Sequence, residues 1–314
     1  MGLTALTLKL SYHTMCFSDI PQMVGLASMP GAHVSAEAFV AAVERVAAHK
    51  NRTVVVKLGG SAMEDPTATD ACLKSVATLN RLGIPIVLVH GGGKPIDRAM
   101  TEAGLVPKKV AGRRYTDDAT LAIVVRVLKD EINAGLVATL GKLGTTTEGV
   151  SNSLHGERLL LPGLDLQPID LGRVGKVNQV NTDLLGKILS RGVPVIPSIA
   201  IDTDTGWLNV NADTAASAVA GALKADKAIF LTDTPGVLRD RSKPESLIPK
   251  LTEAECRDLI ASGVIDGGMV PKVEACFEAL EAGAKSALIL DGRVPFSLLD
   301  VFLHDTFTGT EITR

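Results

Sequence analysis

The sequence predicts an α/β protein with an open, mainly parallel sheet sandwiched between helices. Segments rich in β-branched residues alternate along the chain with segments that carry apolar residues at helical spacing, and glycines repeatedly follow the apolar strands. The predicted strands read as nearly continuous apolar runs, which is typical of parallel strands buried on both faces. With 314 residues and 46% hydrophobic content, the chain is long enough to bury such a sheet.

The predicted elements follow one another as strand, glycines and helix. Their boundaries come from apolar periodicity, from glycine or proline near helix ends, and from the capping-box spacing of Thr252 and Glu255. The predicted helices cover residues 36–49, 69–82, 95–104, 117–140, 183–190, 212–224, 252–263 and 268–283. The predicted strands cover residues 53–58, 85–89, 193–199, 228–231 and 286–290. Residues 159–180 read instead as short β-hairpins laid over the mouth of the sheet.

The chain divides into four predicted regions. Residues 1–34 form a flexible extension, which has too little arginine for a transit peptide and lacks the ordered parts of a signal peptide. Residues 35–52 carry an N-terminal helix. Residues 53–205 and 206–314 form two lobes, because the alternation of strands and helices continues through the second half.

Composition excludes several classes of function. A formal net charge of -3 with interspersed charges provides no basic surface for nucleic acid. No apolar run approaches the roughly 20 residues that a membrane-spanning helix needs, so we expect no membrane partner. Cys16, Cys72, Cys256 and Cys276 are far apart and form no metal-binding motif, which favours reduced thiols in a cytoplasmic protein.

Glycine clusters stand at the predicted carboxyl ends of strands, where open parallel sheets bind ligands. They are Gly59-Gly60, Gly91-Gly92-Gly93 and, before a helix, Gly267-Gly268. Glycines allow close backbone approach, so that exposed N–H groups and a positive helix N-terminus can face a phosphate. The chain has neither a Walker A loop nor a G-x-G-x-x-G segment after a strand, which argues against P-loop and dinucleotide-binding proteins.

Charged residues beside these glycines suit phosphoryl transfer. Lys57 interrupts an otherwise apolar strand, and Lys272 lies in a first helical turn, where the helix dipole disfavours a cation. An acceptor carboxylate is already ionised at neutral pH and needs no general base, so the difficulty is repulsion between two anions. We expect Lys57 and Lys272 to offset this repulsion while Asp213 holds them in place. Asp213 and Asp233 could alternatively be only helix or turn caps.

Four motifs carry a resemblance to a known family. They are Lys57–Gly60, Val89–Gly93, Leu231–Val237 and Asp266–Lys272, in order from about Thr53 to the C-terminus. Together they resemble the nucleotide and phosphate elements of the amino acid kinase family. Within that family, Gly112–Asp117 and Asn209–Asp213 are similar to the branch that phosphorylates N-acetylglutamate.

The resemblance implies a role for each matching residue. The resemblance implies that N-acetyl-L-glutamate is bound by Gly92, Gly93, Arg114 and Asn209. The planar guanidinium of Arg114 would hold the α-carboxylate. Lys57 and Lys272 would stabilise the transition state, and Asp213 would organise them. The nucleotide, ATP with Mg²⁺ and with no metal ligand from the protein, would be bordered by Gly59, Gly60, Asp233 and Gly236. Residues 53–205 would then form the acceptor lobe and residues 206–314 the ATP lobe.

The implied reaction forms an acyl phosphate on the γ-carboxylate, an early step of arginine biosynthesis. Arginine-inhibited members of the family resemble this chain in having a helix before the first strand, and the resemblance implies a homodimer or hexamer. Phe296 and Asp300 stand where those members commonly carry His and Glu, and Lys94 replaces a common proline. Inhibition by arginine is therefore left open.

Two other readings of the sequence remain. A related kinase could act on N-acetylaminoadipate, aspartate or carbamate, because one methylene of acceptor length is worth only roughly 1–3 kcal/mol of discrimination. A noncatalytic arginine-sensing or carrier-binding module could also keep this fold. The presence of Lys57, Asp213 and Lys272 together argues against the module, which has no need of all three.

Overall fold

The central feature of the fold is a mainly parallel sheet. The structure is a computed structural model that describes residues 34–162 and 168–314, so the predicted extension lies outside it apart from Val34. In the described residues, eight strands pair in the order β12-β14-β13-β11-β1-β2-β8-β5. All neighbours are parallel except β13 and β14. The bounds are β1 Val54–Leu58, β2 Ile86–His90, β5 Thr147–Gly149, β8 Val193–Pro197, β11 Lys227–Thr232, β12 Lys250–Thr252, β13 Ser286–Asp291 and β14 Thr310–Thr313.

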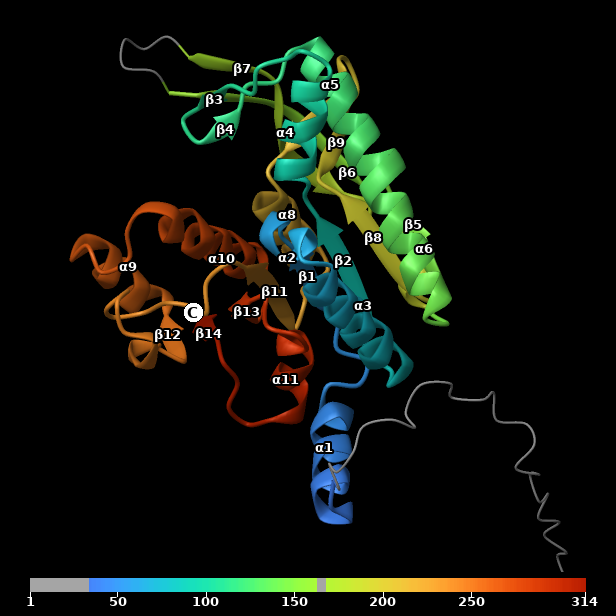
Figure 1. The fold of residues 1–314 in the computed structure, drawn as a ribbon, viewed down its shortest axis with the longest axis vertical. Coiled ribbons are helices and arrows are strands. Elements are labelled where there is room, and N and C mark those ends of the chain that lie inside the picture. Colours follow the sequence, from blue (N-terminus) through green and yellow to red (C-terminus); the bar gives the residue numbers. More distant parts are fainter. Residues whose placement is uncertain (1–33, 163–167) are drawn as a thin grey trace, which may run out of the picture. The chain divides into compact units, whose positions relative to one another are not determined.

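Helices cover both faces of this sheet (Figure 1). The α-helices are α1 Ala36–Ala48, α2 Gly60–Glu64, α3 Pro66–Arg81, α4 Gly93–Glu102, α5 Asp118–Val125, α6 Ala134–Lys142, α7 Thr182–Leu189, α8 Ala212–Ala222, α9 Glu253–Ala261, α10 Val270–Ala282 and α11 Ser297–Leu303. Apolar side chains of α3, α6 and α11 pack on one face, and those of α7 to α10 pack on the other. The predicted sheet between two helical layers is confirmed.

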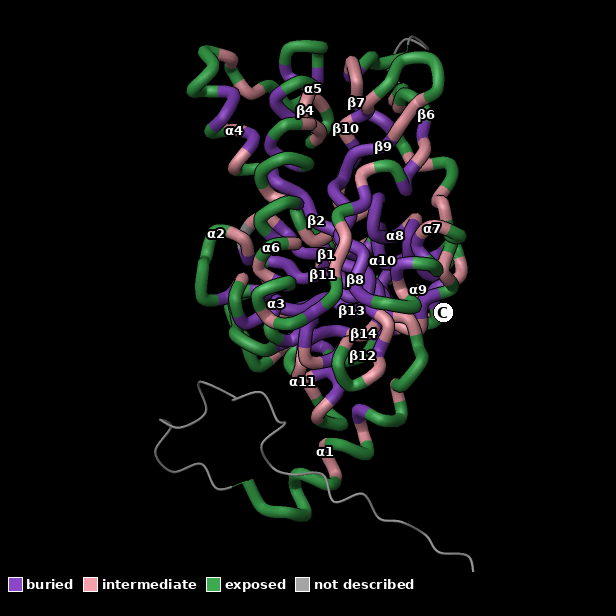
Figure 2. Tube along the Cα trace, turned by 90° about the vertical axis from the view of Figure 1, so that its right-hand side faces the viewer, coloured by how far each residue is buried: buried purple, intermediate pink, exposed green. Residues whose placement is uncertain are grey.

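Side-chain alternation along β1 sets the direction of its one charged residue. Val55 packs in the layer that contains α8 and α10, whereas Val54 and Val56 pack in the layer that contains α3 and α6. Because successive side chains of a strand point to opposite faces, Lys57 falls on the same face as Val55. Figure 2 shows β1 among the buried strands of the sheet. The side chain of Lys57 reaches Asp213 on α8 from this strand.

A second, smaller sheet stands beside the first. In the described residues, β6 Leu154–Leu161, β7 Ile169–Val180, β9 Ile199–Asp202 and β10 Gly206–Val210 form a closed four-stranded barrel. The antiparallel pair β6-β7 confirms the predicted hairpin, and β9 and β10 close it into a barrel. The predicted strand 193–199 is divided, because β8 ends at Pro197 and β9 begins at Ile199.

A two-stranded hairpin lies near this barrel in the fold. It pairs β3 Lys109–Val110 with β4 Arg113–Arg114, and the two residues of its turn, Ala111 and Gly112, have φ values of 47° and 75°. Positive φ at both turn positions is the geometry of the tight hairpin turn that matches strand twist. The turn leads directly into β4, which consists of the adjacent residues Arg113 and Arg114.

The division into lobes at residues 205 and 206 remains a prediction. Strands β1, β2, β5 and β8 of the first predicted lobe form one half of the large sheet, and β11 to β14 of the second form the other half. β10, which belongs to the second predicted lobe, pairs with β7 and β9 of the first. The two predicted lobes therefore share one sheet.

The helix predicted over residues 117–140 is not uniformly α-helical. Between α5 and α6, residues Arg126–Asn133 form a π-helical segment. Its last residue, Asn133, is buried and donates hydrogen bonds to Val195 O at 2.9 Å and to the ring of His90 at 3.1 Å. These contacts with β2 and β8 act against a regular α-helical turn, which sequence periodicity alone does not reveal.

Two exclusions made from composition can be compared with the described residues. Within residues 34–162 and 168–314, no helix is long and apolar enough to cross a membrane. In the same ranges Cys72, Cys256 and Cys276 are buried free thiols, as predicted, and burial raises the pKa of Cys72 to about 12. Cys16 lies outside the described residues.

The buried imidazole of His90 makes stability depend on pH. Burial lowers the pKa of His90 from 6.5 to about 4, so between these values the unfolded chain binds more protons than the folded protein. The contribution of the neutral His90 ring to stability is therefore fully present above pH 6.5 and is lost as pH falls toward 4. We expect the free energy of unfolding in urea to be lower at pH 5 than at pH 7 by about 2 kcal/mol on account of this group.

His90→Leu should remove this part of the pH dependence, whereas His304→Leu, which changes an exposed ring, should retain it. An unchanged pH dependence in His90→Leu would contradict the assignment.

Candidate active site

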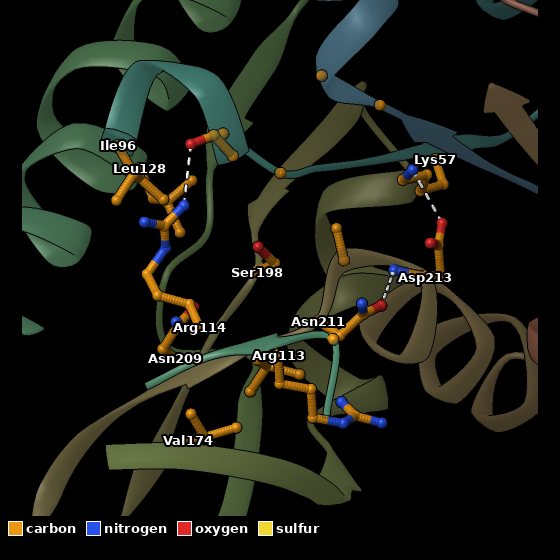
Figure 3. A pocket seen from close by; sticks show the side chains of 18 of the residues that line it. Lys57, Ile96, Arg113, Arg114, Leu128, Val174, Ser198, Asn209, Asn211 and Asp213 are labelled. Carbon is orange, nitrogen blue, oxygen red and sulfur yellow. Dashed lines mark hydrogen bonds and ion pairs between the residues drawn. The ribbon is translucent and has the colours of Figure 1, made fainter. Parts of the chain in front are cut away.

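A cavity of about 260 Å³ opens at the carboxyl ends of β1, β2 and β8 (Figure 3). Its walls come from the large sheet, the small barrel and the hairpin β3-β4. The sequence-predicted residues that line it are Lys57, Gly59, Gly60, Gly92, Gly93, Arg114, Asn209 and Asp213. The structure therefore brings together the predicted acceptor residues and two of the three predicted catalytic residues. We refer to this space as the acceptor cavity.

Lys57 and Asp213 form an ion pair in the wall of the acceptor cavity. Lys57 Nζ lies 2.8 Å from Asp213 Oδ1, and the two side chains are 12% and 22% exposed. Asp213 lies in the first turn of α8, where Asn211 caps the helix by accepting hydrogen bonds from the N–H groups of Asp213 and Thr214. The opposite charge of Asp213 thus holds the amine of Lys57 in the wall of the cavity.

The glycines of the acceptor cavity fall into two groups. A Cβ atom at Gly59 would lie 2.8 Å from the backbone oxygen of Leu231, so this position has no room for a side chain, and one at Gly92 would lie 2.6 Å from Ile132 Cδ1, so that side chain would have to move. A Cβ atom at Gly60 or Gly93 would meet no atom within 4 Å. These two residues begin α2 and α4, and neither helix start has a side-chain cap among the described residues. Their first N–H groups are thus available to an anion.

Arg114 is held at the edge of the acceptor cavity by α4. Its guanidinium donates to Asp97 and, at 3.0 Å, to Gly93 O, and its side chain is 9% exposed. Asn209 on β10 donates from Nδ2 to Thr116 Oγ1 at 3.0 Å. Figure 3 shows Arg114 and Asn209 on the same side of the cavity, across from the Lys57–Asp213 pair.

Sequence reasoning missed several lining residues. Lys109, Arg113, Ser198 and Asn211 also line the cavity. Ser198 directly follows β8, so the rule that ligands bind at carboxyl ends of strands could have identified it. Lys109 and Arg113 reach the cavity only because the β3-β4 hairpin folds beside it. Among the described residues that line the cavity, four side chains are basic and one is acidic, which favours anionic ligands.

A second cavity of about 450 Å³ lies at the end of β11. Asp233, Gly236 and Lys272 line it, and because Asp233 and Gly236 are the residues predicted to border a nucleotide, we refer to it as the nucleotide cavity. Lys272 Nζ donates to Asp233 Oδ1 at 2.6 Å, and this hydrogen bond holds the pKa of Asp233 below its usual value. Its apolar lining is Val237, Leu238, Val264, Ile265 and Met269.

The two cavities lie at the same edge of the large sheet. β1 and β11 are parallel neighbours with Leu58 opposite Leu231, so their carboxyl ends stand about 5 Å apart. Among the contacts of the described residues, Lys57 pairs with Asp213 and Lys272 pairs with Asp233, each in its own cavity. Gly59 and Gly60, predicted to border the nucleotide, line the acceptor cavity instead of the nucleotide cavity.

A metal site made of protein side chains needs several ligating groups close together. Within residues 34–162 and 168–314, no group of three His, Cys, Asp or Glu side chains is arranged to hold a metal ion.

Comparisons with known proteins identify the family of the chain. Residues 52–291 match the Amino acid kinase family. The chain is 38% identical over 290 residues to an acetylglutamate kinase of Methanococcus aeolicus, covering 90% of this chain and 98% of that protein. It is 40% identical over 290 residues to an acetylglutamate kinase of Methanocaldococcus jannaschii, covering 89% and 96%.

Solved structures share the fold at lower identity. An N-acetylglutamate synthase from Neisseria gonorrhoeae, complexed with coenzyme A and N-acetyl-glutamate, superposes with a TM-score of 0.78 at 22% identity, covering 90% of this chain and 64% of that chain. The carbamate kinase of Giardia gives a TM-score of 0.63 at 14% identity, covering 83% and 98%. The family match over most of the chain and the fold agree with the resemblance carried by the sequence motifs. The chain belongs to the amino acid kinase family.

Proposed function

We propose that this protein is an acetylglutamate kinase, which transfers the γ-phosphoryl group of ATP to the γ-carboxylate of N-acetyl-L-glutamate in an early step of arginine biosynthesis. The observation that carries the proposal is the Lys57–Asp213 pair in a cavity lined by two uncapped helix starts and several basic side chains. Relatives at 38% and 40% identity over nearly their whole length are acetylglutamate kinases, which supports the choice of acceptor.

The reaction requires charge compensation more than covalent help. A carboxylate oxygen of the acceptor forms a bond to the γ-phosphorus as the bond from that phosphorus to the bridging oxygen of ADP breaks. The acceptor carries no proton to remove at neutral pH, so no general base is needed. The Lys57 amine offsets charge on the acceptor side and the Lys272 amine offsets charge on the nucleotide side, in agreement with their cavities at neighbouring strand ends.

ATP suits the nucleotide cavity. Its apolar walls can pack against a base, and Lys272 together with the glycine turn Gly267-Gly268 before α10 can receive phosphates. Gly60 and Gly93 then face the transferred group from the acceptor side. Mg²⁺ would enter on the phosphates of the nucleotide and neutralise part of their charge.

Arg114 and Asn209 are suited to orient the acceptor. An incoming α-carboxylate can compete with Asp97 for the guanidinium of Arg114, because a planar guanidinium can bind a carboxylate through two parallel hydrogen bonds. Asn209 lies on the same side of the cavity and presents an amide to the acetylamino group. The relatives favour N-acetylglutamate over N-acetylaminoadipate or aspartate as acceptor.

The proposal also includes the cellular location and the oligomeric state of the enzyme. We place it in the cytoplasm as a homodimer or hexamer, in keeping with the family resemblance. A related structure, the Neisseria synthase, was solved with coenzyme A and L-arginine. Measuring activity with and without arginine tests whether arginine inhibits the protein. Measuring its mass in solution tests whether it is a homodimer or a hexamer.

An assay of ADP formation with N-acetylglutamate, N-acetylaminoadipate and aspartate tests the proposal directly. We expect turnover with N-acetylglutamate at a kcat/KM at least about tenfold above that with N-acetylaminoadipate, since one methylene is worth about that factor or more. Aspartate is one methylene shorter and also lacks the acetyl group, so its kcat/KM should be lower by at least the same factor. A higher kcat/KM with another acceptor would assign the protein to a different kinase. No turnover with any of them would favour the noncatalytic module.

Replacing either cavity lysine should slow catalysis. Lys57→Ala and Lys272→Ala each remove a positioned charge, so we expect kcat to fall roughly 100-fold or more in steady-state assays. Lys74→Ala, which removes an exposed lysine paired with Asp70 on α3, is the control and should retain the parental kcat. A near-normal rate in either cavity variant, with Lys74→Ala also normal, would remove that lysine from the mechanism.

Arg114→Lys should weaken binding of the acceptor selectively. Lysine keeps the charge but cannot hold a carboxylate through two parallel hydrogen bonds, so we expect the KM for N-acetylglutamate to rise about tenfold while the KM for ATP changes little. The matched control is Arg98→Lys on the same helix as Asp97, because Arg98 pairs with Glu64 at the surface. Equal increases in both KM values would contradict the role given to Arg114.

A further inference from the structure

A buried imidazole stands directly before the glycine triplet of the acceptor cavity. His90 ends β2, has no exposed surface, and lies on the face of the sheet opposite to that of Lys57. Its Nδ1 is 3.1 Å from Gly91 O, and its Nε2 is 3.1 Å from Asn133 Nδ2. The ring thus connects the first residue of the Gly91–Gly93 loop to the π-helical segment.

These contacts determine which ring nitrogen carries the proton. A carbonyl oxygen can only accept, so Nδ1 of His90 must donate to Gly91 O. Asn133 Nδ2 also lies 2.9 Å from Val195 O, which identifies it as the amide nitrogen with one N–H left for the ring. Nε2 of His90 therefore accepts, and the imidazole is neutral in the Nδ1–H form. The burial that lowers the pKa of His90 to about 4 acts in the same direction.

The π-helical segment supplies a second contact with the same loop. The side chains of Leu128 and Ile132 occupy the space where a Cβ atom of Gly92 would lie, 2.7 Å and 2.6 Å away. Leu128 also lines the acceptor cavity beside Ile96 (Figure 3). In an α-helix, residues five apart such as Leu128 and Asn133 would point about 140° from each other. The wider turn of a π-helix brings their directions closer together, so that Leu128 reaches Gly92 while Asn133 reaches His90.

We propose that Asn133 and His90 are positioning residues, which fix the Gly91–Gly93 loop for acceptor binding through a single imidazole tautomer clamped by the π-helical segment. This inference rests on the proposed function only for the identity of the acceptor. The glycine triplet contributes no side chain that could hold it in place, so its geometry depends on the neighbours of its backbone.

Nuclear magnetic resonance of the parent protein tests the tautomer without any substrate. In protein labelled with ¹⁵N-histidine, we expect His90 at pH 7 to be neutral with the proton on Nδ1. A proton on Nε2, or a charged ring at pH 7, would overturn the inference whether or not the chain phosphorylates N-acetylglutamate.

Kinetics of Asn133→Ala test the effect on the loop. We expect the KM for N-acetylglutamate to rise about tenfold with little change in the KM for ATP, and the amide resonances of Gly91, Gly92 and Gly93 to shift. Ser75→Ala is the matched control, because it also removes a buried side-chain hydrogen bond, to Ala71 O, but on α3. It should change neither KM value. Equal changes in both KM values of Asn133→Ala, or unshifted loop resonances, would overturn the inference.

Gly149→Ala provides an independent variant that leaves both polar side chains intact. A Cβ atom at Gly149 would lie 2.2 Å from Asn133 Oδ1, so the added methyl group must displace the amide. We expect the same selective rise in the KM for N-acetylglutamate as in Asn133→Ala. Parental kinetics in Gly149→Ala, with the Asn133 resonances shifted, would contradict the coupling. If the parent lacks turnover with N-acetylglutamate, the proposed function fails. The tautomer of His90 and the resonances of the Gly91–Gly93 loop still test whether His90 and Asn133 position that loop.

Discussion

The parallel register of the central strands is the constraint on which the rest of the site depends. Leu58 at the end of β1 lies opposite both His90 on β2 and Leu231 on β11, so the chain leaves these strands at one common edge. Parallel strands require long crossovers, and those crossovers begin with glycine-rich turns and helix N-termini at this same edge. Anion-binding backbone groups from distant parts of the sequence are thereby gathered without any local contact between the motifs.

Because successive side chains of a strand point to opposite faces, Lys57 and His90 lie on opposite faces of the sheet. Lys57 points into the α8 layer, where Asp213 supplies an opposite charge at 2.8 Å. His90 points into the other layer, where its ring contacts two neutral polar groups, the carbonyl oxygen of Gly91 and the amide of Asn133. Lys57 is paired with a carboxylate and reaches a cavity, whereas the fully buried ring of His90 has no counter-charge and remains neutral.

The basic groups of the site are held by internal carboxylates. Lys57, Lys272 and Arg114 contact Asp213, Asp233 and Asp97, respectively. Such pairing holds three long side chains in place and avoids leaving charges partly desolvated and uncompensated. The positive groups of the site are thereby positioned by contacts within the chain itself.

Local periodicity and single residues were enough to predict the main strands and helices, the glycine clusters and the exceptional lysine of β1, but not short elements such as α2, α11, β5, β12 and β14. The sequence also predicted the pairing of Lys57 with Asp213, although it assigned Lys272 to the same carboxylate, whereas the structure pairs Lys272 with Asp233. The π-helical turn, the closure of the small barrel and the cavity residues of the β3-β4 hairpin were decided only by tertiary structure. Each depends on contacts between residues far apart in the chain, such as Asn133 with His90 and Val195, and no local pattern encodes which distant group will satisfy a buried hydrogen-bonding atom.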